Sequence, residues 1–215
     1  MDERQQRRRR DAEANRDSLL DAALRALAED PDAGLDAVAR AAGLTRRTVY
    51  GHFPSREALV TALADRAGQA VADVVRVVRE SRPEAEHPLT TLARLEVALW
   101  RSVERYRLLG RLATRPEHLE HVARHTGNVR AFRMELVEAG RACGALHTAM
   151  PCEVVARLVQ AVPLTVFDAV VEGTLDAGDA ARVTAVTALA VAGADPARVD
   201  VHVDAALTTT LGEPS

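Results

Sequence analysis

The stretch from Leu35 to Leu59 constrains the fold more than any other part of the chain. Residues 35–42 (LDAVARAA) predict a short helix that ends at Gly43, because glycine readily adopts the left-handed conformation that follows many helices. Shortly afterwards, Thr45 can cap a second short helix over residues 46–52. Two short helices joined by such a turn are typical of a helix-turn-helix.

The apolar residues of this stretch predict how the two helices pack together. We expect Val38, Val49 and Phe53 to face inward, and we expect Leu44 in the turn to be buried between the helices. The first residues of the second helix then remain on the surface.

Helical spacing of apolar residues continues along the rest of the chain, and it predicts an all-α fold. A first helix is expected over about residues 11–29, and Ser55 caps a long fourth one that reaches about residue 79. Further helices are expected near residues 89–109, 116–125, 128–143, 152–172, 179–192 and 196–210. Residues 199–203 alternate apolar and polar side chains, so a strand is an alternative there.

The composition agrees with packed helices in a reducing compartment. Aromatic residues make up 3% of the chain against 47% for all hydrophobic residues, which favours helices over a sheet. Cys143 and Cys152 do not form a CxxC pair, and we expect both thiols to be buried and inert. Because no uninterrupted apolar run reaches the length of a membrane span, we expect a cytoplasmic protein with no membrane partner.

The net charge of -3 hides a local basic patch. No acidic residue lies between Asp36 and Glu57, whereas the same window holds Arg40, Arg46, Arg47 and Arg56. A basic patch on a helix-turn-helix is the electrostatic footprint of DNA binding. The residues expected to contact DNA are Thr45, Arg46, Arg47, Thr48, Tyr50, His52 and Arg56.

The run GLTRRTVYGHFPSREAL, residues 43–59, closely resembles the signature of the TetR (tetracycline-repressor) family. The resemblance extends from Asp17 to Leu63, with Arg56 where the family generally has Lys and Leu27 where an aromatic residue is common. It is carried by Gly43, Tyr50, His52, Phe53, Ser55, Glu57 and Leu59. The resemblance implies a homodimer, a three-helix DNA-binding domain with a connecting fourth helix, and a divergent helical domain that houses an effector pocket.

These inferences predict an all-α protein of three parts. Residues 1–10 form a disordered Arg-rich arm, and residues 11–60 form the helix-turn-helix DNA-binding domain. Residues 61–215 form a helical effector-binding and dimerisation domain, in which the family resemblance and the long apolar faces of residues 152–172 and 179–192 predict the dimer interface. For the arm, contact with a neighbouring minor groove and simple solubilising disorder are both open.

Soft and aromatic side chains on the predicted central helices are candidates for the effector pocket, although they can equally be core. They are Trp100, Val103, Tyr106, Arg107, Phe132 and Met134. His118, His121 and His125 share one side of a helix, but a span of two turns does not suit one metal ion, so we expect no metal and no cofactor.

No catalytic motif occurs in the sequence, so we expect no enzyme. The favoured function is a repressor that a small molecule releases from a palindromic operator in double-stranded DNA. A transcriptional activator or a corepressor-dependent regulator of the same fold is an alternative. A helical ligand-binding or adaptor protein is an alternative from another class, but it leaves the acid-free basic window unexplained.

Overall fold

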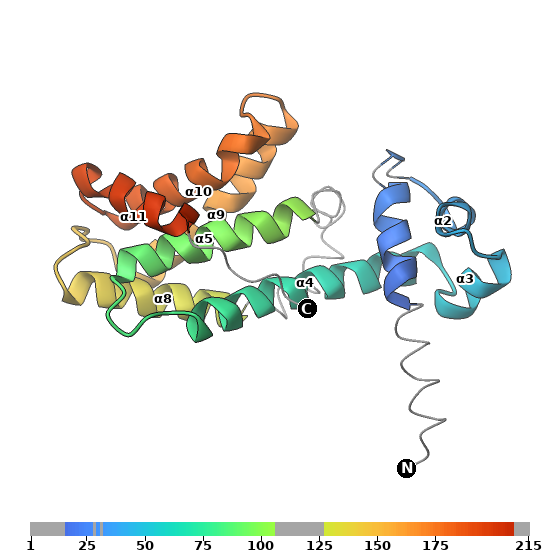
Figure 1. The fold of residues 1–215 in the computed structure, drawn as a ribbon, viewed down its shortest axis with the longest axis horizontal. Helices are drawn as coiled ribbons and strands as arrows, with labels where there is room; N and C mark the ends of the chain where they lie inside the picture. The colour runs from blue at the N-terminus through green and yellow to red at the C-terminus, as the bar shows by residue number, and fades with distance from the viewer. Residues whose placement is uncertain (1–15, 28, 31, 106–126, 209–215) are drawn as a thin grey trace, which may run out of the picture. The chain divides into compact units, whose positions relative to one another are not determined.

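The computed structural model describes residues 16–27, 29, 30, 32–105 and 127–208, and most of these residues are helical (Figure 1). Within these ranges the β-structure is limited to one isolated bridge, between Leu146 and Ala194. The predicted all-α class is therefore confirmed. The chain divides into two compact units inside the long helix α4 (Arg56–Glu80), with the boundary after Ala67.

The first unit contains the predicted helix-turn-helix. Residues 16–27 are helical, α2 spans Leu35–Ala42 and α3 spans Arg46–His52, which are the predicted bounds of these two short helices. Gly43 follows α2 with a φ of 64°, so the left-handed turn is confirmed. The core of the first unit consists of buried apolar side chains from its four helical segments. Among them are Leu19, Leu20, Ala23, Leu27, Leu35, Val38, Val49, Phe53, Leu59 and Leu63.

The expectation that Leu44 is buried is wrong, because 37% of this residue is exposed. The turn is closed by the backbone: the amide of Gly43 donates to the carbonyl of Arg40 at 3.1 Å, and the amide of Leu44 donates to that of Ala39 at 2.9 Å. Val38 and Val49, both fully buried, supply the apolar side chains of α2 and α3. The turn therefore keeps its shape without a side chain packed beneath it.

The second unit is built around α5 (Pro88–Arg105), which packs against each of the described helices that follow it. Figure 1 shows α5 between α8 on one side and α10 and α11 on the other. These helices are α8 (Gly127–Ala142), α9 (Cys152–Val171), α10 (Ala177–Ala192) and α11 (Pro196–Thr208). The bounds differ from those predicted by a few residues, as expected from sequence patterns.

Local structure explains two of the differences. The carboxylate of Asp176 accepts from the amide of Gly178 at 2.7 Å, so α10 begins earlier than the sequence predicted. Residues 199–203 are helical, and the strand alternative there is wrong. Val199 and Val203, one helical turn apart, are both buried in the core, which gives α11 its inner face.

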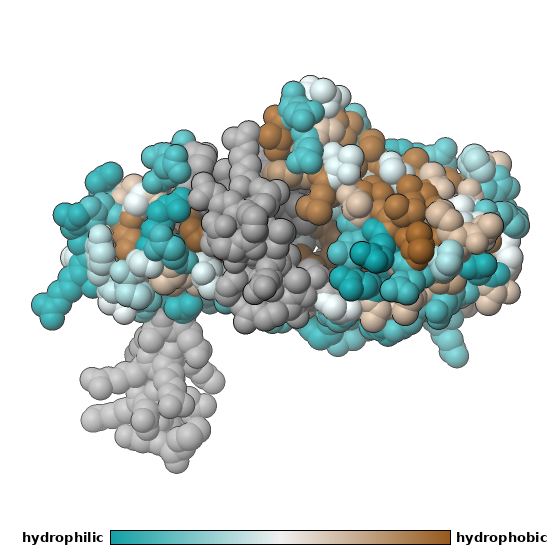
Figure 2. Space-filling view, turned by 180° about the vertical axis from the view of Figure 1, so that it is seen from behind, coloured by the Kyte–Doolittle hydropathy of each residue, from teal (hydrophilic) through white to brown (hydrophobic). Residues whose placement is uncertain are grey.

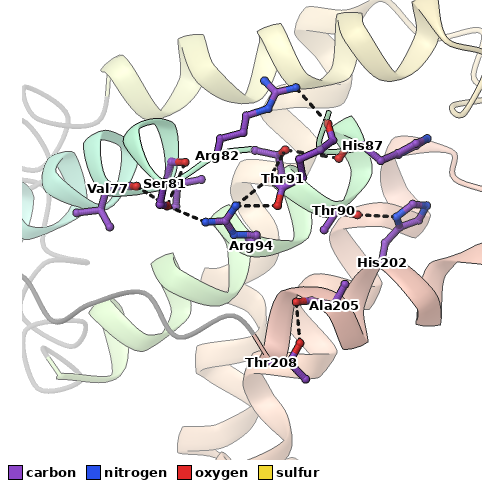
Figure 3. Close-up of polar contacts among 12 residues, drawn as sticks. Val77, Ser81, Arg82, His87, Thr90, Thr91, Arg94, His202, Ala205 and Thr208 are labelled. Atoms are coloured by element: carbon purple, nitrogen blue, oxygen red, sulfur yellow. Dashed lines mark hydrogen bonds and ion pairs between the residues drawn. The ribbon is translucent and has the colours of Figure 1, made fainter. Parts of the chain in front are cut away.

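A partly buried polar cluster joins the end of α4 to the start of α5 (Figure 3). The guanidinium of Arg94 donates from Nη1 to the carboxylate of Glu86 at 2.7 Å and from Nη2 to the hydroxyl of Ser81 at 2.7 Å. Glu86 also accepts from the hydroxyl of Thr91 at 2.7 Å, and Ser81 donates to the carbonyl of Val77 at 2.7 Å. The cluster fixes where α4 ends relative to α5 within the second unit.

The two cysteines differ from the expectation of buried thiols. Cys143 is exposed just after α8, and Cys152 is partly exposed at the start of α9, where Arg141 Nη1 donates to its sulfur at 3.4 Å. They lie at the two ends of the segment between α8 and α9, and Cys152 packs partly against the core of the second unit. The predicted arm at residues 1–10, the predicted helix at residues 116–125 and the histidines at 118, 121 and 125 lie outside the described residues.

Candidate nucleic-acid interface

The start of α3 is fixed by its cap. The Thr45 side chain accepts from the amide of Thr48 at 3.2 Å, and the two hydroxyl oxygens lie 2.8 Å apart. The carbonyl of Thr45 accepts from the amide of Val49 at 3.2 Å, which closes the first turn. The amino-terminal end of α3 is therefore held rigidly at the surface, beside Thr45 and Thr48.

One side of α3 is buried and the other is open. Val49 is 0% exposed, whereas Tyr50 is 48% exposed. The side chain of Arg46 is 70% exposed, and Arg47 is also exposed. His52 is half-buried, with its ring centroid 6.4 Å from that of Phe53. The structure thus brings together on α3 the predicted residues Thr45 to His52, with both arginines at the leading end.

Arg56, at the start of α4, is half-buried, as are Thr48 and His52. Its Nε donates to the carbonyl of Ala33 at 3.3 Å, which ties α4 to the loop before α2. Beside it, Ser55 accepts from the amide of Ala58 at 3.2 Å, as predicted for the cap of this helix. The pKa of Glu57 lies below its ordinary value, because its own backbone amide and the Ser55 hydroxyl hydrogen-bond to the carboxylate.

An ion pair that sequence reasoning missed joins α2 to α3. Arg46 donates from Nε and from Nη2 to the two carboxylate oxygens of Asp36, which lies in the first turn of α2. The sequence contains a signal for this pair, since Asp36 is the acidic residue at the edge of the basic window. Each partner remains partly open to solvent, with Asp36 38% exposed in its side chain.

Of the candidate effector residues that the structure describes, Trp100 and Phe132 lie in different clusters. Trp100, 2% exposed, packs with Val162, Val166 and Phe167 of α9. Phe132, also 2% exposed, belongs to the main core of the second unit, and Met134 is half-buried on α8. The side chain of Val103 and all of Tyr106 and Arg107 lie outside the described residues.

A second feature missed from the sequence is the contact between α8 and the end of α4. Arg79 places its guanidinium carbon 4.2 Å from the centroid of the Phe132 ring and donates to the carboxylate of Glu135 at 2.7 Å. One turn earlier on α8, the amide of Asn128 donates to the carbonyl of Ala72 at 3.3 Å. Because Asn128, Phe132 and Glu135 share one face of α8, this face contacts α4 over two turns of α8.

Helix α9 carries an unusual amount of exposed apolar surface. Its exposed large apolar side chains are Val154 (42%), Leu158 (44%), Leu164 (58%) and Val171 (37%). Hydrophobic side chains gather on the second unit in the view from behind (Figure 2). Among the described helices, α9 is the one long and apolar enough to meet the length and composition of a membrane span. Its opposite side, with Val155 and Val159, belongs to the core of the second unit.

Comparison with known proteins gives matches of two kinds. Residues 19–63 match the model of the bacterial regulatory proteins, tetR family. The HTH-type transcriptional repressor LfrR of Mycolicibacterium smegmatis is 46% identical over 52 residues, which are 24% of this chain and 28% of LfrR. The sequence similarity to LfrR thus spans little more than a quarter of that protein.

The fold similarity extends over most of the chain. A TetR-like transcriptional regulator from Rhodococcus sp. RHA1 matches with a TM-score of 0.64 and 19% identity, covering 83% of this chain and 96% of that one. SmeT, the repressor of the Stenotrophomonas maltophilia multidrug efflux pump SmeDEF, matches with a TM-score of 0.62 and 22% identity, covering 81% and 88%. SmeT has also been solved as a complex with triclosan.

The described residues therefore form a helix-turn-helix protein with a separate helical second unit. Residues 19–63 match the tetR family of bacterial regulatory proteins, and the fold of most of the chain is similar to that of TetR-like regulators.

Proposed function

We propose that this protein is a sequence-specific DNA-binding transcription regulator, acting as a repressor. The observation that carries the proposal is the leading end of α3. It is capped by Thr45, it exposes Arg46 and Arg47, and it lies in a window without any acidic residue between Asp36 and Glu57. A helix N-terminus with exposed arginines suits both phosphate oxygens and guanine edges.

In this proposal α3 enters the major groove of operator DNA. Thr45, Arg46, Arg47 and Thr48 face base edges and neighbouring phosphates, and Tyr50 and His52 donate to phosphate oxygens. Arg56 contributes a positive charge at the start of α4, where the helix N-terminus adds to the attraction for a phosphate. Its hydrogen bond to Ala33 then also fixes the position of that charge.

The working unit is a two-fold homodimer joined through α9 and α10. Val154, Leu158, Leu164 and Val171 leave an apolar face on α9 whose opposite side is already packed in the core. A second copy presents the same apolar face, and two such faces cover one another in an isologous contact, as in other four-helix seams. We therefore assign this surface to a second copy in the cytoplasm and not to a membrane.

The effector is an apolar or amphipathic small molecule bound in the second unit. SmeT, which shares the fold, binds triclosan, a molecule of this kind. Phe132, a large buried apolar group in the main core of the second unit, is the candidate contact for the effector, and Trp100 lies in a separate cluster. Helix α4 begins in the first unit and ends in the second, where Arg79 covers Phe132. A ligand that moves Phe132 therefore acts directly on the helix that starts beside the DNA.

A binding titration with DNA from upstream of its own gene tests the proposal. We expect sequence-specific binding that weakens steeply as the salt concentration rises from about 50 to about 200 mM, because bound cations leave the phosphates on binding. Equal binding to a shuffled sequence, or none at low salt, would reject it in favour of a ligand-binding or adaptor protein. A reporter gene behind the same DNA then separates repression from activation or corepressor dependence.

A further inference from the structure

We propose that Asp36 is a positioning residue, which holds Arg46 side-on so that the far end of its guanidinium reads a guanine in the operator. The inference rests on the proposed function, because it assigns a base and a positioning group to the DNA-reading end of α3. Asp36 itself touches no base in this scheme. It acts through Arg46 alone.

The geometry of the ion pair leaves the base-reading edge of Arg46 available. Asp36 accepts one hydrogen bond from Nε and one from Nη2 of Arg46. These two nitrogens form one edge of the planar guanidinium. A guanidinium has five N–H donors, so three remain, two on Nη1 and one on Nη2. These three N–H donors lie at the far end of the side chain, away from Asp36. Guanine offers two neighbouring acceptors, O6 and N7, in the major groove, and two parallel donors on one edge match them.

The carboxylate is itself anchored to a fixed element. Asp36 lies in the first turn of α2, where the positive end of the helix dipole favours a negative charge. Val38 and Ala39, a few residues further on, are buried and hold α2 in the core of the first unit. Arg46 is 70% exposed in its side chain, so without this pair it would be free to sample many rotamers. The pair removes that freedom before DNA arrives.

The charge of Asp36 also disfavours the alternative role for Arg46, a plain phosphate contact. A carboxylate beside the guanidinium repels phosphate oxygens and offsets the attraction of the arginine for the DNA backbone. An arginine that only had to neutralise phosphate would bind better without this neighbour. Pairing therefore favours discrimination between bases over general affinity.

The adjacent Arg47 provides a matched control. It is exposed on the same turn of α3, and it forms no ion pair with any residue in the described ranges. Removing the partner of Arg46 therefore changes the setting of one of two neighbouring arginines. The base contacts of Arg47, if it makes any, stay independent of Asp36.

The test measures affinities for the operator and for a panel in which each G·C pair is changed in turn, with wild type, Asp36→Asn, Arg46→Ala and the double variant. For wild type we expect one G·C pair whose replacement weakens binding about tenfold or more. Arg46→Ala should abolish that preference. Asp36→Asn should reduce it several-fold at that pair alone while leaving affinity for shuffled DNA unchanged or higher, and the double variant should match Arg46→Ala.

Several results would overturn the inference while leaving DNA binding intact. One is an Asp36→Asn protein that binds every sequence more tightly by the same factor, which would reduce Asp36 to a repulsive charge. Another is a wild-type preference that survives Arg46→Ala. Asp36→Glu, which keeps a carboxylate, should recover part of the preference, and thermal unfolding of each variant separates a loss of reading from a loss of fold. If wild type itself shows no sequence preference, the proposed function fails first.

Discussion

Glu96 of α5 and Arg133 of α8 form a two-pronged ion pair inside the second unit. Arg133 donates from Nε to one carboxylate oxygen at 2.7 Å and from Nη2 to the other at 2.9 Å. The side chains are 0% and 5% exposed, so both charges have lost their water and depend on one another. This pair fixes the register of α8 against α5, and with it the position of the neighbouring Phe132.

Removing Glu96 alone should strongly destabilise the folded protein. We expect Glu96→Ala to lower the free energy of unfolding by about 3 to 5 kcal/mol, because it leaves a buried guanidinium without a counter-charge. Replacing both residues together, as Glu96→Leu with Arg133→Met, should recover most of that loss. Urea unfolding measures both, with Glu138→Ala on the exposed side of α8 as the control. Equal stability of Glu96→Ala and the control would contradict the buried pair.

The apolar face of α9 gives a prediction about assembly. We expect Leu164→Glu to convert the dimer into a monomer at micromolar concentration, because it places a charge in the middle of the proposed interface. Val201→Glu is the matched control, since Val201 is even more exposed, at 69%, and lies on α11, which is not part of the proposed interface. Sedimentation velocity should show a dimer for wild type and for the control. A monomeric wild type would refute the assignment of this face.

Arg47 and Arg56 should differ in what they contribute to DNA binding. If Arg47 reads a base, Arg47→Ala should cost about 1 to 3 kcal/mol of operator affinity and relax the preference at one position. Arg56→Ala should weaken all sequences alike. Arg76→Ala, on the exposed surface of α4, provides a control for the loss of one positive charge. Unchanged operator affinity for both Arg47→Ala and Arg56→Ala would exclude the docking of α3 described above.

The environment of His202 leads us to expect that the protein loses stability in mild acid. Burial lowers its pKa below 6.5, and the nearby charges of His87 and Arg198 act in the same direction. Its ring stacks on that of His87 at 4.5 Å, and its Nδ1 lies 2.8 Å from the hydroxyl of Thr90 (Figure 3). The folded chain therefore binds a proton less readily than the unfolded chain, so stability is present above pH 6.5 and decreases as the pH falls below it.

The measurement compares melting temperatures at about pH 7.5 and about pH 5.5. Wild type should lose more on acidification than His202→Gln, which cannot take up a proton at this position. His147→Gln, in an exposed position, should behave like wild type. An identical acid response of wild type and His202→Gln would show that the histidine pair does not sense this range.

The sequence predicted the helix-turn-helix well because its signals are local. A glycine at φ 64°, a threonine cap and a proline after Phe53 each determine the backbone within a few residues, so α2 and α3 have the predicted bounds. The same reasoning failed for Leu44, because apolar residues at turns are buried only where the fold provides a partner.

The contacts that sequence reasoning missed all join residues far apart in the chain. Arg79 with Phe132, Glu96 with Arg133 and Asp36 with Arg46 depend on which helix faces meet. Helical periodicity indicates that a face is buried but not which face it packs against. For this reason Trp100 and Phe132, grouped by chemistry in the sequence, belong to separate clusters in the fold.

A footprint of the purified protein on the DNA upstream of its gene tests whether a dimer reads the operator through α3. We expect protection of two half-sites with inverted sequences, centred about one helical turn or a small multiple of it apart, since a two-fold protein matches a two-fold site. The protection should disappear for Leu164→Glu and remain for the control Val201→Glu. A single protected half-site with wild type, or protection without any sequence preference, would contradict a dimeric regulator that reads its operator through α3.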